Sequence, residues 1–284
     1  MKGVAFLQYR FGPSIYGNTF DRAKNSLWRS YHKECQEHFN SNDAHMFMTT
    51  RKKVAELRRD SLCVLGAYSN DNLAKKVAKY FEDEDSVYAA VPQNIQVLWA
   101  DLIFKSIEPF VHIIESFYKS YFQPYWLSVQ QTKPGSTSAA SSFGWHIDDN
   151  PKEMLKLFIY LNDVSEQNGA FRAFPKRTSK YLLLKGFRSG GEESRLRAQK
   201  SINTFLENKP RKLKVLEGQA GTVLAFDNNL VHKGTAPLNG FRHAIQIPIF
   251  PSKEKINVEM FRRGLLSTRN RDYPQDPNFN DYGN

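Results

Sequence analysis

The sequence predicts a mainly β chain with N-terminal helices, in which a double sheet of jelly-roll type forms the core. Up to about residue 122, apolar residues recur at helical spacing in three stretches. After Pro124, short segments rich in aromatic and β-branched residues alternate with turn residues. Eight such segments without regularly interleaved helices are typical of two sheets packed face to face around a mouth that can hold a ligand.

Residues 1–122 are expected to form a helical support region within a single domain that spans residues 1–284. Helices are predicted over residues 18–39, 71–83 and 94–122, and a strand is expected within residues 57–67, approached from a charged helix. In the second helix Leu73, Val77 and Phe81 share one face. We expect these helices to cover one outer face of the double sheet.

Residues 123–252 are predicted to hold the β core, followed by a polar C-terminal tail over residues 253–284. The expected strands cover residues 125–133, 143–149, 155–163, 169–175, 213–216, 221–227, 230–234 and 242–250. Gln167-Asn168-Gly169 predicts a hairpin turn between the third and fourth strands, because Asn-Gly tolerates positive φ. A basic insertion at residues 176–212, with a short helix over residues 194–206, is expected to rim the barrel.

Composition excludes several classes of protein. With 284 residues, of which 40% are of apolar type, the chain can bury a full core, which excludes disorder as its main state. The absence of a long apolar run predicts no membrane span, and the N-terminal residues lack a signal-peptide pattern, so we expect a cytoplasmic protein. Cys35 and Cys63 are too few for a disulfide framework or a zinc cluster. Any metal must therefore use histidine and carboxylate.

The positive charge is concentrated in one segment. The formal net charge is +11, and residues 176–214 hold twelve basic residues against three acidic ones. Such a segment indicates an anionic partner, although a solvated basic face is the plain alternative. Arg172 and Lys176, at the predicted mouth, are the candidate contacts to a small anionic substrate.

A candidate metal site begins at residues 146–148, within the second predicted strand. Side chains on a strand alternate between its faces, so His146 and Asp148 point the same way while Ile147 packs into the opposite side. His232, eighty-six positions later in another predicted strand, is the candidate third ligand. Two imidazoles and one carboxylate on one face of an octahedron leave open positions, as in non-haem iron(II) oxygenases.

The residues around these three candidates resemble a known family. The segments 143–148 (FGWHID), 157–163 (LFIYLND), 168–175 (NGAFRAFP) and 221–227 (GTVLAFD), followed by His232 and Arg242, resemble the phytanoyl-CoA dioxygenase (PhyH-like) family in order and spacing. The resemblance covers about residues 57–250. It implies a double-stranded β-helix, a cupin-like jelly-roll barrel, and the use of iron(II), dioxygen and 2-oxoglutarate, mostly to hydroxylate unactivated carbon with release of succinate and CO2.

The resemblance also implies residue roles. His146, Asp148 and His232 match the metal ligands of the family, and Arg242 matches the arginine that binds the far carboxylate of 2-oxoglutarate. A planar guanidinium suits that task, because it pairs with a carboxylate through two hydrogen bonds. In the last predicted strand Arg242, Ala244 and Gln246 share one face, whereas three isoleucines share the other: Ile245, Ile247 and Ile249. That division predicts a polar cavity side and an apolar packing side.

The chain departs from the family pattern at two places. Residues 175–178 (PKRT) stand where many relatives have Pro-Gly-Ser-His, which alters the expected substrate rim. Gly234 stands where some relatives offer a hydroxyl to the cosubstrate, so that contact is expected from Thr235 or from Gln130 on the first strand. Relatives that halogenate have a small residue at the position of Asp148, so the carboxylate here disfavours halogenation.

Two other hypotheses stay open at this stage. The basic segment would also suit a jelly-roll protein that binds nucleic acid or an anionic surface and has a degenerate or structural metal site. Against this, the segment lacks regularly interleaved aromatic residues for base stacking. A metal-dependent barrel without the cosubstrate, such as a cupin-like isomerase or hydrolase, is the third possibility.

Overall fold

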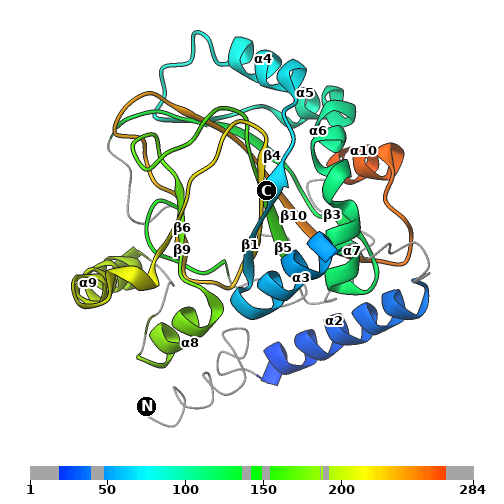
Figure 1. The fold of residues 1–284 in the computed structure, drawn as a ribbon, viewed down its shortest axis with the longest axis horizontal. Helices are drawn as coiled ribbons and strands as arrows, with labels where there is room; N and C mark the ends of the chain where they lie inside the picture. The colour runs from blue at the N-terminus through cyan, green and yellow to red at the C-terminus, as the bar shows by residue number, and fades with distance from the viewer. Residues whose placement is uncertain are drawn as a thin grey trace.

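Two antiparallel sheets of unequal size form the centre of the fold (Figure 1). The computed structural model describes residues 19–39, 48–135, 142–148, 154–185, 187 and 192–266. The large sheet has the strand order β1-β8-β5-β10-β4-β2, with β3 also paired to β10, and the small sheet has the order β7-β6-β9. In chain order the strands are β1 (Leu62–Ala67), β2 (Tyr88–Ala90), β3 (Tyr121–Pro124), β4 (Ser128–Thr132), β5 (Leu155–Tyr160), β6 (Phe171–Ala173), β7 (Lys214–Leu216), β8 (Thr222–Asp227), β9 (His232–Lys233) and β10 (Arg242–Ser252).

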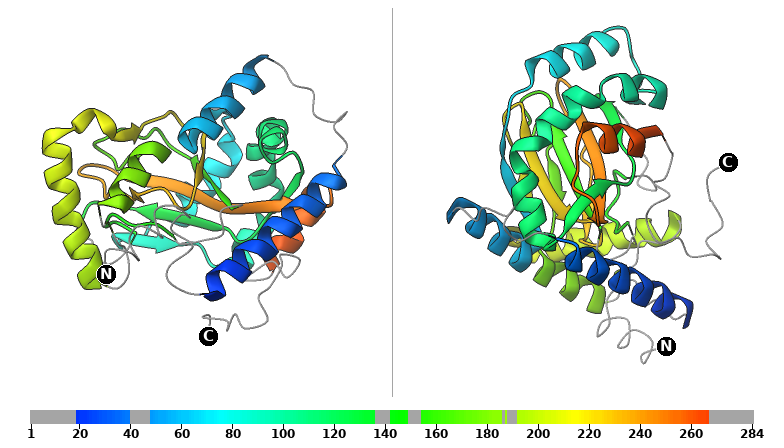
Figure 2. Two further views of the ribbon diagram at one scale, coloured as in Figure 1. Left: turned by 90° about the horizontal axis from the view of Figure 1, so that it is seen from below. Right: turned by 90° about the vertical axis from the view of Figure 1, so that its right-hand side faces the viewer.

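Helices cover the outer face of the large sheet, and others lie beside the small sheet (Figure 1). In the right-hand view of Figure 2, helices that cover the large sheet lie in front of it. The helices before the core are α2 (Thr19–Glu37), α3 (Met48–Asp60), α4 (Asp71–Tyr80), α5 (Gln93–Leu98), α6 (Ala100–Ile107) and α7 (Val111–Tyr118). The later helices are α8 (Lys176–Leu184), α9 (Glu192–Asn208) and α10 (Val258–Leu266), and 3₁₀ turns occupy Glu108–Phe110 and Pro210–Lys212.

Strict alternation along β5 and β10 separates two environments. Leu155, Leu157 and Ile159 of β5 join the apolar core under the helices, as do three isoleucines of β10, Ile245, Ile247 and Ile249. The intervening residues of β5 face the other way, where Phe158 and Tyr160 pack between the two sheets. A period of two places successive side chains on opposite faces of a sheet, which explains how one strand serves both environments.

The space between the two sheets is only partly filled. Phe158, Phe171 and Phe226 form part of an aromatic cluster there, with ring centroids of Phe171 and Phe226 4.5 Å apart. A separate cluster behind the small sheet joins Trp145 and Ile147 to α8 and α9. The first cluster leaves part of the space between the sheets open, and Phe158, Phe171 and Phe226 line the resulting cavity.

Several sequence predictions agree with this architecture. The helices predicted over residues 18–39, 71–83 and 194–206 correspond to α2, α4 and α9, and the strand expected in residues 57–67 is β1, preceded by the charged helix α3. Seven of the eight predicted strands appear, and Leu73 and Val77 of α4 are fully buried. No helix in the described part of the chain is long and apolar enough to cross a membrane.

Other predictions need correction. The single helix expected over residues 94–122 is divided into α5, α6, a 3₁₀ turn and α7, and its end is the strand β3. Residues 143–149 contribute an isolated bridge at His146 instead of a strand. The turn at residues 167–169 joins strands of different sheets, so it closes no hairpin, although Gly169 does have φ of +96°.

The predicted regions also differ in content from the structure. The N-terminal support region contributes β2 to the large sheet in addition to the expected strand β1, and the region predicted as a tail contains α10. The basic insertion holds two helices, α8 and α9, where one was expected. The part of the predicted tail beyond residue 266 lies outside the described residues.

Candidate metal centre

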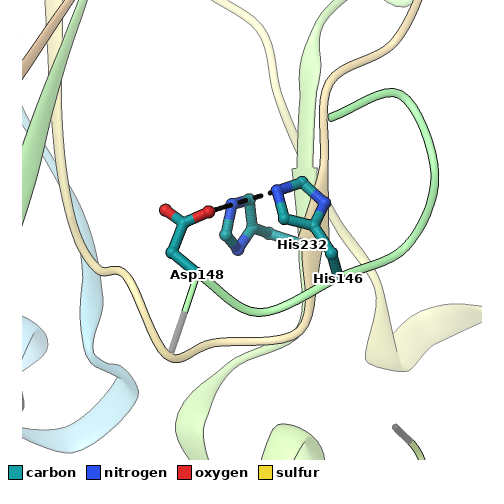
Figure 3. A group of neighbouring side chains, drawn as sticks. All are labelled: His146, Asp148 and His232. Carbon is teal, nitrogen blue, oxygen red and sulfur yellow. Dashed lines mark ion pairs between the residues drawn. The ribbon is translucent and has the colours of Figure 1, made fainter. Parts of the chain in front are cut away.

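His146, Asp148 and His232 come together at one end of the cavity (Figure 3). One ligand atom from each of the three residues lies within 4.8 Å of the others, the arrangement expected of groups that share a metal ion. Asp148 Oδ1 is 3.3 Å from His146 Nε2 and 3.8 Å from His232 Nε2. In the described part of the chain, no other group of histidine, cysteine and carboxylate side chains meets this criterion.

Backbone pairing fixes the two histidines side by side. His146 and His232 exchange backbone hydrogen bonds in both directions at 2.9 Å, and Asp148 N donates to Asn228 O at 3.0 Å. A strand is not needed here, because this short bridge places the segment around His146 against β9. The sequence prediction that these residues converge is thus met by a local pairing between distant parts of the chain.

Each imidazole is oriented by its second nitrogen. His146 Nδ1 lies 2.7 Å from Gly144 O, and His232 Nδ1 lies 2.8 Å from Leu230 O. A carbonyl only accepts hydrogen bonds, so Nδ1 carries the hydrogen and Nε2 is left with its lone pair. Backbone carbonyls commonly orient metal-binding histidines in this way. Both Nε2 atoms are therefore available as ligands.

The electrostatic environment keeps His232 and Asp148 in ligand form. Burial, with the neighbouring His146 acting in the same direction, lowers the pKa of His232 to about 3, so this imidazole is neutral near pH 7. Burial alone would raise the pKa of Asp148, but Lys156, His232 and His146 together hold it well below its usual value. The carboxylate is therefore ionised.

Lys156 is a site residue that the sequence analysis missed. It lies on β5 with 7% of its surface exposed, and its ammonium is 2.5 Å from Asp148 Oδ2. Because β5 is buried along its whole length, a lysine facing the cavity needs an acidic partner. The signal in the sequence is this one charged residue inside an otherwise apolar strand.

Arg242 lies at the other end of the cavity and is buried, with 3% exposure. Its guanidinium donates to the carbonyl oxygens of Gly169 and Thr235 and to the Thr132 hydroxyl, the last two at 3.2 and 3.3 Å. Its Nε is buried and has no partner in the described structure. A side chain at Gly169 would meet Thr235 O at 2.6 Å, so glycine permits this close packing. The arginine is thus fixed by the backbone and keeps unused capacity to bind an anion.

Gln130 and Thr235, the two predicted second contacts to a cosubstrate, have different positions. Gln130 is buried and lines the cavity, and its Oε1 accepts a hydrogen bond from the Tyr88 hydroxyl at 2.7 Å. Thr235 is absent from the described lining residues and instead supports Arg242 through its carbonyl. Gln130 is therefore better placed to contact a ligand.

The cavity between the ion site and Arg242 has a volume of about 400 Å³. Gln130 and Gln246 line it together with Lys156 and Arg242, and several aromatic side chains form its walls: Tyr88, Phe143, Phe158, Phe171 and Phe226. The predicted polar face of the last strand is confirmed, since Arg242 and Gln246 both line the cavity. A small molecule of a few hundred cubic ångströms fits this space.

Neither Arg172 nor Lys176 lines this cavity. Arg172 forms an ion pair with Glu166 at 2.6 Å. Lys176 begins α8 and lines a separate cavity between α2, α3, α7 and α8. Arg172 lies on β6 itself and Lys176 begins the helix after it, and the predicted contact of these two residues with a substrate in the cavity is not supported.

Comparisons with known proteins concern the fold. No family model matches the sequence, and no curated protein matches it. Among solved structures, the chain is similar to the epimerase SnoN in complex with Fe3+, alpha ketoglutarate and nogalamycin RO, with TM-score 0.47 and 16% identity over 71% of this chain and 83% of that chain.

Two further solved structures give similar values. EctD from S. alaskensis with 2-oxoglutarate and 5-hydroxyectoine has TM-score 0.48 and 15% identity over 74% of this chain and 78% of that chain. AviO1 from Streptomyces viridochromogenes Tue57 has TM-score 0.48 and 17% identity over 72% and 96%. At this level of similarity, the function has to be inferred from the residues of the site itself.

Proposed function

We propose that this chain is an iron(II)- and 2-oxoglutarate-dependent dioxygenase on a double-stranded β-helix scaffold. The reaction is the hydroxylation of an unactivated carbon of a small molecule, with release of succinate and CO2. The observation that carries the proposal is that one cavity has a two-histidine, one-carboxylate cluster at one end and a buried arginine without a carboxylate partner at the other. The anionic character of the substrate remains a prediction from the sequence.

The ion site fits iron(II) by the chemistry of its donors. Two imidazole nitrogens and one carboxylate oxygen would supply three ligands to an ion, and the cavity beside them could hold further ones. Structural zinc sites are instead closed by four protein ligands, most often cysteine and histidine. His146, Asp148 and His232 would hold the ion.

The opposite end of the cavity fits the far carboxylate of 2-oxoglutarate. Arg242 is fully charged at neutral pH, buried and unmatched by an acidic side chain in the described contacts, and its Nε has no partner. A buried charge of this kind is stabilised when a carboxylate binds it. Gln130 is placed to add a hydrogen bond to the same group.

The protein's own part in the reaction is to bind, orient and exclude water. Bound iron(II), with dioxygen and 2-oxoglutarate, supplies the oxidising chemistry. Phe158 follows Lys156 on the same face of β5, with its ring centre 5.7 Å from the guanidinium carbon of Arg242, and Phe158, Phe171 and Phe226 line the cavity with apolar surface. These walls suit a carbon skeleton and keep bulk water from the reacting carbon.

The proposal is tested by succinate release. Protein loaded with iron(II) in air-saturated buffer is given 2-oxoglutarate and a panel of small anionic metabolites, and succinate is measured with and without each one. We expect at least one metabolite to stimulate release, and Asp148→Ala to reduce it by at least about 100-fold, because a lost metal ligand costs more than the ~10–100-fold of a supporting residue. Equal succinate release by wild type and Asp148→Ala would contradict the assignment.

The binding-protein hypothesis has a separate test. It requires that nucleic acid or anionic vesicles bind through the segment around α8 and α9, with affinity that falls steeply as salt rises. The binding-protein hypothesis does not predict that 2-oxoglutarate binds in an ion-dependent way. The metal-dependent barrel without a cosubstrate would instead be favoured if 2-oxoglutarate failed to raise the Tm of manganese-loaded protein.

A further inference from the structure

The two oxygens of Asp148 have different neighbours. Oδ1 faces the two imidazoles, 3.3 Å from His146 Nε2 and 3.8 Å from His232 Nε2, whereas Oδ2 accepts a hydrogen bond from Lys156 at 2.5 Å. A free carboxylate binds a divalent cation through one oxygen or through both. With Oδ2 held by the ammonium, only Oδ1 is available to the ion.

Lys156 is fixed in place for this contact. It extends from the middle of the large sheet, where β5 pairs with β8 and β10, and 7% of its surface is exposed. Its ammonium lies 5.7 Å from the centre of the Phe226 ring and 5.8 Å from that of Trp126. Aromatic faces attract a cation at this range, so these two rings favour the observed position of the ammonium.

We propose that Lys156 is a positioning residue that keeps Asp148 a one-oxygen ligand and holds the ion affinity down, so that positions on the ion stay open for a keto acid. The inference rests on the proposed function, because it concerns how the ion site accepts 2-oxoglutarate. An ion could bind to the two histidines and Asp148 without this lysine. The position of Lys156 indicates that it restricts Asp148 to binding through one oxygen.

Removal of the Lys156 charge should raise the affinity for the ion and lower the affinity for the keto acid. Without the ammonium, both oxygens of Asp148 can bind the ion, and a positive charge close to the dication is gone, so the ion binds more tightly. The second oxygen then occupies a position that the keto acid needs, and the cavity has lost a cation that attracts it. The keto acid therefore binds more weakly to the ion-loaded protein. A substitution that merely disordered the site would instead weaken the binding of both the ion and the keto acid.

The experiment measures both affinities on the full chain. Mn2+ is titrated into anaerobic, metal-free wild type and Lys156→Met, and 2-oxoglutarate is then titrated into each manganese-loaded protein, by calorimetry. We expect Lys156→Met to bind Mn2+ at least about tenfold more tightly. We expect its 2-oxoglutarate affinity to fall by at least about fivefold, in line with the loss of one charged contact.

Two controls separate this effect from local damage. Lys233→Met makes the same change in β9 next to His232, but its ammonium lies over the Trp145 ring on the other side of the strand, so both affinities should stay within about twofold. Lys156→Leu removes both the charge and the donor, and it gives the same reading if Lys156→Met does not fold. We expect Lys156→Leu to tighten Mn2+ binding as well.

Unchanged or weaker Mn2+ binding by the folded Lys156 variant would overturn the inference, as would unchanged 2-oxoglutarate affinity. Failure of the wild type to bind 2-oxoglutarate in the presence of Mn2+ is a different result. It would overturn the proposed function.

Discussion

The same strands form both faces of the large sheet, but the two faces differ in the polarity of their side chains and in what those side chains contact. On the helix side, β10 presents Ile245, Ile247 and Ile249, each fully buried in the main apolar core. On the cavity side, the same strand presents Arg242 and Gln246 to an open space of about 400 Å³. The difference arises from a period of two along one strand.

This division implies that stability and chemistry can be altered separately. The helix side contains tightly packed apolar side chains, where the loss of volume is costly. The cavity side contains Arg242, whose Nε has no partner in the described structure, and the cluster of His146, Asp148 and His232. Substitutions one residue apart along β10 should therefore have unrelated effects.

The largest effect on stability is expected from Ile247→Ala on the helix side. Ile247 has no exposed surface, and its truncation leaves a cavity that costs about 2–5 kcal/mol of the free energy of unfolding. Denaturant unfolding measures this loss, and Mn2+ affinity of the folded fraction should stay within about twofold. A large fall in Mn2+ affinity without loss of stability would show that the two faces are not independent.

Arg242→Met on the cavity side should give the reverse pattern. The loss of a charged hydrogen-bonding group should weaken 2-oxoglutarate binding to the manganese-loaded protein by about 10- to 100-fold, which corresponds to roughly 1.5–3 kcal/mol. The Tm should change little, because removal of a buried charge offsets the lost hydrogen bonds. Arg172→Met is the matched control, since Arg172 pairs with Glu166 outside the cavity. Equal weakening by both variants would refute the role of Arg242.

A smaller effect concerns pH and His243, the histidine next to Arg242 on β10. Burial lowers the pKa of His243 to about 4, with Lys133 acting in the same direction, while its Nε2 lies 2.8 Å from Gln131 Oε1. In the unfolded chain His243 takes up a proton near pH 6.5. The contribution of neutral, buried His243 to the free energy of unfolding is therefore complete above pH 6.5 and is lost as the pH falls toward 4.

The replacement His243→Gln should make the stability of the protein less dependent on pH over that window. Denaturant unfolding of wild type and variant at pH 7, 6 and 5 measures the slope. A wild-type free energy of unfolding that rises as the pH falls from 7 to 5, or an equal slope in both proteins, would contradict the explanation.

The sequence predicted the parts of the site that depend on local pattern. The alternation in residues 242–250 identified the cavity face, and the His-x-Asp spacing with His232 identified three groups that the structure does bring together. Their roles as iron ligands, and the resemblance to the phytanoyl-CoA dioxygenase family, remain predictions. Polar residues at two-residue spacing inside an apolar strand are informative because burial makes them costly unless they act together.

The remaining features depend on long-range contacts. Residues 121 and 122 were predicted to end a helix but begin β3, because β10 extends far enough to pair with them. Residues 143–149 were predicted to form a strand, but residues 143–148 are held by the bridge between His146 and His232 and by the hydrogen bond from Asp148 N to Asn228 O. Lys156 was missed because its partner, Asp148, lies outside β5 and meets it only in the folded chain.

The central claim is that one cavity binds a divalent ion and 2-oxoglutarate together. The most direct measurement is an anaerobic titration of the iron(II)-loaded protein with 2-oxoglutarate, followed by visible absorption. The account predicts a weak band that appears with 2-oxoglutarate, saturates at one equivalent per chain and is absent in Asp148→Ala. Iron(II) binding with no new absorption at saturating 2-oxoglutarate would contradict it.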